Sequence, residues 1–124
     1  MPVSRIEAES LNKIMSGGIT DEGTTTVVVK FYSNGCHYCH ALSDYYIDLS
    51  EQDNYDNIYF FAFNVDDTPE VAEKLSLNGV PSIALFQTRN GSCIKTRVME
   101  DPDNPHDKTW YTIKQIKNFI DREV

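Results

Sequence analysis

The most informative segment of the sequence runs from Val27 to Leu42 and reads Val-Val-Val-Lys-Phe-Tyr-Ser-Asn-Gly-Cys-His-Tyr-Cys-His-Ala-Leu. It opens with a β-branched apolar run, which is typical of a strand buried on both faces of a sheet. Ser33, Asn34 and Gly35 follow as a cluster of turn-forming residues. Beyond two cysteines separated by two residues, the apolar spacing becomes helical. The sequence therefore predicts a strand, a turn and a C-x-x-C motif at the start of a helix.

The C-x-x-C motif brings two thiols to one helix end. Cys36 would lie at the helix N-terminus, where unpaired backbone N–H groups and the positive end of the helix dipole favour a thiolate. Cys39 would lie one turn further along, close enough to form a disulfide with Cys36. We interpret Cys36 as the thiolate that attacks a substrate disulfide, and Cys39 as the thiol that resolves the mixed disulfide. This chemistry uses a redox-active Cys36–Cys39 disulfide and requires neither a cofactor nor a metal.

The length and charge of the chain limit the classes of protein to consider. Its 124 residues fit a single domain, residues 1–124, that is large enough to bury a core. The formal net charge of -8 at pH 7, with no basic patch, argues against a nucleic-acid partner. No apolar run of about 18 residues is present, so we expect neither a membrane span nor a membrane partner.

The cysteine content and the N-terminus both suit a reducing compartment. The segment from Met1 to Glu7 lacks the apolar stretch of a secretory signal. Three cysteines are an odd number, which fits one active pair and a spare thiol, Cys93, better than a disulfide framework. We therefore expect a cytoplasmic protein, although an exported protein whose signal peptide had been removed would show the same pattern.

The remaining patterns place further strands and helices on either side of this unit. Apolar periodicity and the positions of Gly and Pro predict strands over residues 27–32, 58–65, 82–87 and 93–99. Helices are predicted over residues 5–16, 36–52 and 70–77, with a last helix beginning at Thr112-x-x-Gln115, which resembles a capping box. Asn90-Gly91 predicts a hairpin turn between the last two strands. Ser4 is a candidate N-cap for the first helix, Gly17-Gly18 its expected end, and residues 19–25 a polar link.

This order of elements predicts the fold class. A β-α-β half followed by a β-β-α half gives an α/β fold with a mixed four-stranded sheet and helices on both faces. The predicted helix before residue 27 is an addition at the N-terminal end of this arrangement.

Three segments give the chain a resemblance to the thioredoxin superfamily. They are the strand and C-x-x-C turn from Val27 to Leu42, Asn64-Val65-Asp66 at the end of the second strand, and Gly79-Val80-Pro81-Ser82. The last resembles the family's Gly-Ile/Val-Pro-Thr segment, whose proline is cis and faces the dithiol. The similarity covers residues 27–124.

The resemblance implies a thiol–disulfide oxidoreductase that acts on protein disulfides. Its dithiol would be regenerated by an upstream thiol reductant or reductase. It implies a monomer in which Pro81 shapes the substrate groove. The backbone at Val80 would pair with the substrate main chain as an added strand. Tyr32 and Gly35, on either side of the turn, are the other expected substrate contacts.

Several residues depart from the thioredoxin pattern. His37 and Tyr38 stand between the cysteines in place of Gly-Pro, and both are expected to tune the site. A protonated His37 beside Cys36 would make the disulfide a better oxidant, with a potential between ~-270 and ~-120 mV. Lys30 stands where thioredoxins bury an acid, and Ala62 where they place the lysine that partners it. Lys30 would either stabilise the thiolate of Cys39 or point to solvent, because the register cannot be fixed from sequence.

Other classes of protein use similar cysteines. Cys36 to His40 satisfies C-x-x-C-H, the haem attachment pattern, and the same residues offer ligands for zinc or a cluster, with Cys93 and His106 as distant candidates. Tyr38 resembles the Pro-Tyr of glutaredoxins, although no segment supplies the carboxylate grip that glutathione needs. A non-catalytic binding module of the same fold is a further alternative, which the intact C-x-x-C motif disfavours.

Overall fold

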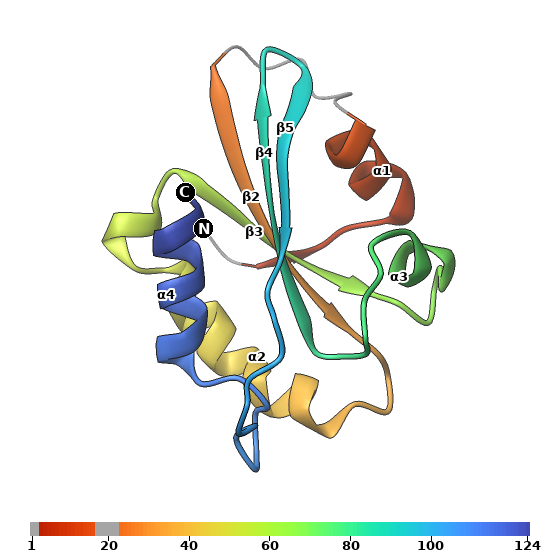
Figure 1. Ribbon diagram of the computed structural model, residues 1–124, viewed down its shortest axis with the longest axis vertical. Helices are drawn as coiled ribbons and strands as arrows, with labels where there is room; N and C mark the ends of the chain where they lie inside the picture. Colours follow the sequence, from red (N-terminus) through yellow and green to blue (C-terminus); the bar gives the residue numbers. More distant parts are fainter. Residues whose placement is uncertain (1–2, 17–22) are drawn as a thin grey trace.

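A computed structural model describes residues 3–16 and 23–124 and shows a twisted mixed sheet between two layers of helices (Figure 1). Within the described residues the sheet has five strands in the order β1-β3-β2-β4-β5. The strands are β1 (Ser4–Arg5), β2 (Thr24–Tyr32), β3 (Ile58–Asn64), β4 (Ser82–Arg89) and β5 (Ser92–Val98). The helices are α1 (Ala8–Ser16), α2 (His37–Ser50), α3 (Glu70–Lys74) and α4 (Ile113–Glu123), with a 3-10 turn η1 (Asp53–Tyr55).

The central strand β2 explains why the segment from Val27 to Leu42 is the most informative. It pairs in parallel with β3 and antiparallel with β4, so that Val29 lies opposite Phe61 on one side and Ala84 on the other. Val27 to Phe31 is buried throughout. A strand covered on both faces and paired at both edges needs the continuous apolar run that the sequence shows.

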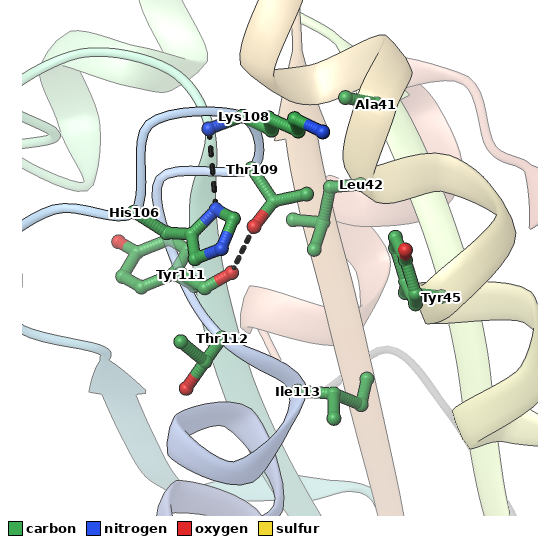
Figure 2. Close-up of a pocket in the computed structure, with 9 residues that line it drawn as sticks. All are labelled: Ala41, Leu42, Tyr45, His106, Lys108, Thr109, Tyr111, Thr112 and Ile113. Atoms are coloured by element: carbon green, nitrogen blue, oxygen red, sulfur yellow. Dashed lines mark hydrogen bonds between the residues drawn. The ribbon is translucent and has the colours of Figure 1, made fainter.

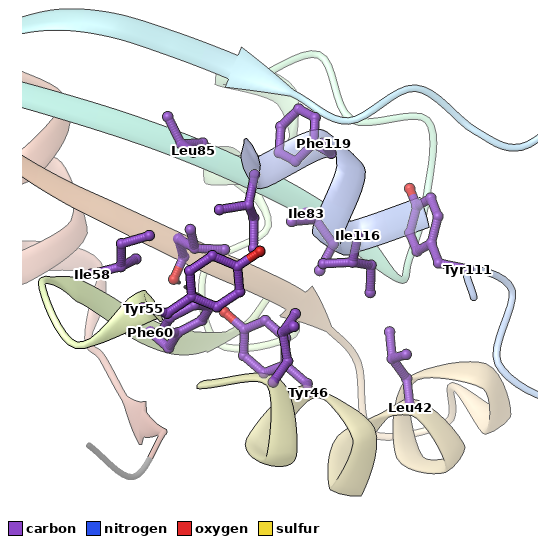
Figure 3. Close-up of a cluster of buried hydrophobic side chains, with 13 residues drawn as sticks. Leu42, Tyr46, Tyr55, Ile58, Phe60, Ile83, Leu85, Tyr111, Ile116 and Phe119 are labelled. Carbon is purple, nitrogen blue, oxygen red and sulfur yellow. Dashed lines mark hydrogen bonds between the residues drawn. The ribbon is translucent and has the colours of Figure 1, made fainter. Parts of the chain in front are cut away.

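The two faces of the sheet carry separate apolar clusters. Helices α2 and α4 cover one face and α1 and α3 the other (Figure 1). Successive residues of a strand point to opposite faces, so Val28 joins the α2–α4 cluster while Val27 and Val29 join the other. Figure 3 shows the α2–α4 cluster, whose labelled members are Leu42, Tyr46, Tyr55, Ile58, Phe60, Ile83, Leu85, Tyr111, Ile116 and Phe119.

Tyr46 fixes helix α2 to the sheet. Its side chain is fully buried, and its hydroxyl lies 3.1 Å from the carbonyl oxygen of Val28 and 2.9 Å from that of Phe61. Because the hydroxyl is satisfied in the core, the ring can be buried without the cost of an unpaired polar group. This anchor sets the position of the C-x-x-C end of α2 relative to β2.

The predicted four-stranded sheet is wrong by one strand. Ser4 and Arg5 form the short strand β1 beside Phe61 and Ala62, and the amide of Ile6 continues the pairing to the carbonyl of Ala62 (3.0 Å). Ser4 is therefore not a helix N-cap, and α1 begins at Ala8. The edge of β3 offers unpaired backbone groups, and two residues are too few to show the alternation by which a strand is recognised. The expected end at Gly17-Gly18 and most of the polar link lie outside the described residues.

The C-terminal elements follow the predicted order. β4 and β5 form the hairpin, with Asn90 and Gly91 both at positive φ (51° and 84°), as a tight two-residue turn requires. The Thr112–Gln115 capping box is confirmed by reciprocal hydrogen bonds of 3.2 and 2.8 Å at the start of α4. Helix α3 is shorter than predicted, ending at Lys74, since Ser76 adopts a left-handed φ of 56°.

Candidate active site

The turn between β2 and α2 places the two cysteines at one end of the sheet. After Tyr32 the chain turns through Ser33, whose carbonyl accepts a hydrogen bond from the amide of Cys36 (3.3 Å). Phe31 pairs with Ser82 in the antiparallel β2–β4 register, so Pro81 lies at the same end of the sheet. The Val80–Pro81 peptide bond is cis, the geometry that the resemblance implies. Pro81 is buried and Val80 half-buried, whereas Gly35 is exposed in the turn.

Cys36 and Cys39 form a disulfide, with their Cα atoms 5.3 Å apart. Cys36 is the N-cap of α2, and its Sγ accepts a hydrogen bond from the amide of Cys39 (3.1 Å). Cys36 is 9% exposed and Cys39 only 1%. Cys36, the more exposed of the two residues, is thus the one at the unpaired amides of the helix end, the position in which a thiolate is stabilised.

A hydrogen-bond network between β3 and the turn holds the active-site loop. The amide of Asn34 donates to Asp66 Oδ2 (2.8 Å), and Asn64 Nδ2 donates to Asn34 Oδ1 (2.8 Å). Asn64 also accepts from the amide of Asp66 (3.0 Å), and the Nε2 of His40 lies 2.9 Å from the Asn34 carbonyl. The sequence pattern predicts Asn64 and Asp66 only as a strand end and does not indicate this role. The residues that follow two adjacent parallel strands, here β2 and β3, lie close together at the same edge of the sheet. This rule could have predicted that Asn34 lies near Asn64 and Asp66.

Lys30 is buried under Cys39. The residue is 5% exposed, and Nζ lies 3.5 Å from the carbonyl oxygen of Cys39. The Nζ also lies 5.5 Å from the ring centroid of Tyr46 and 5.7 Å from that of Tyr32. Burial lowers the pKa of Lys30 from 10.5 to about 8, since a charged ammonium loses hydration there. Of the two alternatives for this side chain, the one that points it to solvent is wrong.

A cavity of about 260 Å³ is lined by both Lys30 and Cys39. Cys39, Tyr32 and Arg5 line it together with Lys30. Tyr32 is half-buried and so contributes to the wall of this cavity on the α2 side of the sheet. The register of Lys30 opposite Ala62 leaves no carboxylate from β3 at this position.

Tyr38 contacts the segment that joins β5 to α4. Its ring centroid lies 5.4 Å from that of Trp110, and the Trp110 Nε1 donates to Asp101 (3.3 Å). Trp110 adopts a left-handed φ of 66°, and its backbone pairs with His106. The sequence pattern does not indicate a contact between Trp110 and the C-x-x-C motif. The contact shows that the segment lies against the C-x-x-C turn.

A groove of about 360 Å³ separates this segment from α2 (Figure 2). Tyr45 lies on the helix side, while His106 and Lys108 lie on the segment side. The segment is held by its own hydrogen bonds, from the Lys108 amide to His106 Nδ1 (3.1 Å) and from Thr109 Oγ1 to the Tyr111 carbonyl (2.7 Å). The groove therefore runs between the Ala41–Tyr45 part of α2 and the β5–α4 segment.

His37 and the remaining cysteine complete the set of predicted residues. His37 is exposed as the first residue of α2, next to Cys36. Cys93 is a half-buried free thiol on the edge strand β5. Across residues 3–16 and 23–124, no three His, Cys, Asp or Glu side chains group as ligands of a metal ion. In the same part of the chain, no helix has the length and apolar character needed to cross a membrane.

Comparisons with known proteins agree with this geometry. The family model described as Thioredoxin matches residues 10–107. A thioredoxin of Ictalurus punctatus is 27% identical over 89 residues, covering 72% of this chain and 80% of that protein. Thioredoxin AMT13 of Alternaria alternata is 33% identical over 61 residues, covering 49% of this chain and 50% of that protein. The crystal structure of Malassezia sympodialis thioredoxin superimposes with a TM-score of 0.67 at 17% identity, covering 98% of this chain and 93% of that one.

Proposed function

This chain belongs to the thioredoxin family and is a thiol–disulfide oxidoreductase with a Cys36–Cys39 dithiol, and we propose that Cys36 is its nucleophile and Cys39 its resolving thiol. The observation that carries this assignment is the position of Cys36 as the N-cap of α2, where its sulfur accepts the amide hydrogen bond of Cys39. Cys39 is the more buried of the two. The nucleophilic thiol must be accessible to the substrate disulfide. The resolving thiol attacks only Cys36 and can therefore be buried.

In the reducing direction the reaction takes two thiol–disulfide exchange steps. The Cys36 thiolate attacks one sulfur of a protein disulfide, and the other sulfur leaves as a thiolate with the electron pair of the broken bond. Cys39 then loses its proton and attacks Cys36 Sγ. The Cys36–Cys39 bond forms, the mixed disulfide breaks, and the second substrate sulfur leaves as a thiolate that takes up a proton. The substrate is reduced by two electrons, and the opposite sequence oxidises a dithiol.

The proposed substrate contacts lie where β2 and β4 meet the turn. Val80 would pair its backbone with an extended substrate segment, and Pro81 would shape the groove next to the disulfide. Gly35 leaves the approach to Cys36 open, because an added Cβ there would have no neighbour within 4 Å. Tyr32 is proposed as a contact at the end of β2, and Tyr38 as a tuning residue through its contact with Trp110.

Members of this family act on protein disulfides and are reduced by a reductase. We propose the same pair of partners for this chain, with a monomer as the working form. The free thiol of Cys93 supports a reducing compartment such as the cytoplasm, since unpaired cysteines are better tolerated there.

Trapping of a mixed disulfide tests the assignment of roles. Cys39→Ser should accumulate a covalent complex with a protein disulfide substrate, because the attack by Cys36 still occurs and resolution does not. Cys36→Ser should accumulate none. The measurement is non-reducing electrophoresis followed by mass spectrometry of the linked peptides, with Cys93→Ser added to both variants. A complex linked through Cys39 in the Cys36→Ser variant would reverse the assignment.

His37 is expected to raise the reduction potential of the pair. A protonated imidazole next to Cys36 stabilises the thiolate, and therefore the reduced form. His37→Gly should lower the potential by roughly 30 mV, about tenfold in the equilibrium constant with glutathione. Equal potentials for the two proteins would rule out this role. His106→Gly, outside the motif, is the control.

A further inference from the structure

The side chain of Lys30 is a buried cation that the two-cysteine mechanism does not use. Its Nζ lies 3.5 Å from the Cys39 carbonyl, and Lys30 and Cys39 both line the cavity of about 260 Å³. Within the described part of the chain no carboxylate lines this cavity. The ammonium is thus held in the core next to the resolving cysteine without an anionic partner.

The other titratable or charged groups that face this cavity are already engaged. Arg5 of β1 forms an ion pair with Asp67 (3.2 Å), and His40 of α2 lies 2.9 Å from the Asn34 carbonyl. The hydroxyl of Tyr46 is directed at two backbone carbonyls, and burial raises the pKa of Tyr46 well above its usual value. The ring of Tyr32 has both Arg5 and Lys30 lying over it, with the Arg5 Cζ 5.9 Å and the Lys30 Nζ 5.7 Å from its centroid. Lys30 is the buried basic residue of this cavity, with its Nζ 3.5 Å from the Cys39 carbonyl, whereas His40 is exposed.

We propose that Lys30, as the neutral amine, accepts the proton of Cys39 when Cys39 resolves the mixed disulfide. The inference rests on the proposed function, in which Cys39 is the resolving thiol. The Cys39 S–H proton passes to Nζ, directly or through one water in the cavity. The Cys39 thiolate attacks Cys36 Sγ, the Cys36–Cys39 bond forms, and the substrate thiolate leaves with the electron pair. The resulting Lys30 ammonium returns its proton to solvent before the next cycle, so the step needs no further reagent.

The environment of Lys30 suits this role. A lysine in water is almost entirely protonated at pH 7 and cannot act as a base. Burial lowers the pKa of Lys30 to about 8, so about one tenth of the molecules carry the neutral amine at pH 7. Once protonated, the ammonium stabilises the neighbouring thiolate during its attack. The same residue thus removes the proton and offsets the charge that remains on sulfur.

The test separates attack from resolution in one experiment. The reduced Cys93→Ser protein is mixed with one equivalent of 5,5′-dithiobis(2-nitrobenzoate) in a stopped-flow absorbance instrument. The first release of the coloured thiolate reports attack by Cys36, and the second reports resolution by Cys39. The rate of the second release should rise between pH 7 and 9 as Lys30 loses its proton. Lys30→Met should slow it about tenfold at pH 7 and flatten this rise, while the first release changes less than twofold.

Two further variants distinguish a base from a mere cation. Lys30→Arg keeps the charge but holds its proton at these pH values, so it should be as slow in the second release as Lys30→Met. Arg5→Met removes another cation from the same cavity and should leave both releases within twofold. A second release at the normal rate in Lys30→Met, or full activity in Lys30→Arg, would overturn the inference. Loss of the first release in the Cys93→Ser parent would instead overturn the proposed function, because that step does not involve Lys30.

Discussion

Substituting Cys36 with serine is expected to lower the rate of protein-disulfide reduction by about a thousandfold or more. A serine hydroxyl fits the same space and can accept the same amide hydrogen bond from Cys39 (3.1 Å in the present protein). It carries almost no alkoxide at neutral pH and forms no covalent link with a substrate sulfur. The substitution should therefore lower the rate of reduction without changing the fold. Reduction of insulin disulfides by dithiothreitol, followed with and without the protein, measures it.

Cys93 provides the matched control for this substitution. It is the third cysteine of the chain, half-buried on β5, with Sγ at 3.6 Å from the Thr96 hydroxyl and the Lys95 carbonyl. Cys93→Ser should leave the rate within twofold. A tenfold loss in Cys93→Ser, ~1.4 kcal/mol in activation free energy, would mean that Cys93 takes part in the reaction. Retention of activity in Cys36→Ser would remove Cys36 from the role of nucleophile.

The elements that could be predicted are those whose signal lies in consecutive residues. A continuous apolar run marked β2, a C-x-x-C motif marked the start of α2, and Asn90-Gly91 marked the hairpin. Each of these patterns strongly favours one local structure, so residues that are neighbours in the chain suffice to identify it. Thr112 and Gln115 likewise form a capping box within a single turn.

The parts that escaped prediction depend on residues far apart in the chain. Strand β1 is defined by its pairing with β3, more than fifty residues away, and the Tyr38–Trp110 contact by the path of the β5–α4 segment. The orientation of the Lys30 side chain could be predicted only if the register of β2 in the sheet was known. Residues two apart in a strand point to the same face of the sheet, so Lys30 points to the same face as Val28. Val28 faces α2 in the structure, and this places Lys30 under that helix.

The burial of Lys30 should be measurable as a loss of stability. In the disulfide form its ammonium has no anionic partner among the described residues, and the pKa falls from 10.5 to about 8. A shift of this size corresponds to about 3 kcal/mol at ~1.4 kcal/mol per pKa unit. Two ring contacts and partial access to water reduce the net cost to about 2 kcal/mol. Lys30→Met should therefore raise the free energy of unfolding of the disulfide form by about 2 kcal/mol at pH 7.

The gain in free energy of unfolding from Lys30→Met should decrease as the pH rises. Below pH 8 the lysine is charged in both the folded and the unfolded protein, so the cost of burial is fully present. Between about pH 8 and 10.5 the folded protein loses the proton while the unfolded chain keeps it, so the stability contributed by Lys30 rises with pH. The advantage of the methionine variant should thus shrink from about pH 8 and disappear near pH 10.5. Tyr46, Tyr55 and Tyr111, whose pKa values burial raises, are common to both proteins and cancel in the difference.

Urea unfolding of the two disulfide-form proteins at pH 7, 9 and 10 measures this difference. Lys13→Met is the matched control, because Lys13 is an exposed lysine whose ion pair with Glu9 is long (3.8 Å), and it should change the free energy of unfolding by less than about 0.5 kcal/mol at each pH. An equal or lower stability of Lys30→Met at pH 7 would mean that the ammonium is well solvated in the folded protein. A gain that did not change between pH 7 and 10 would point to better packing by methionine and not to relief of a buried charge. The expected decline with pH follows only if Lys30 gives up its proton inside the fold, which is also what a proton acceptor for Cys39 must do.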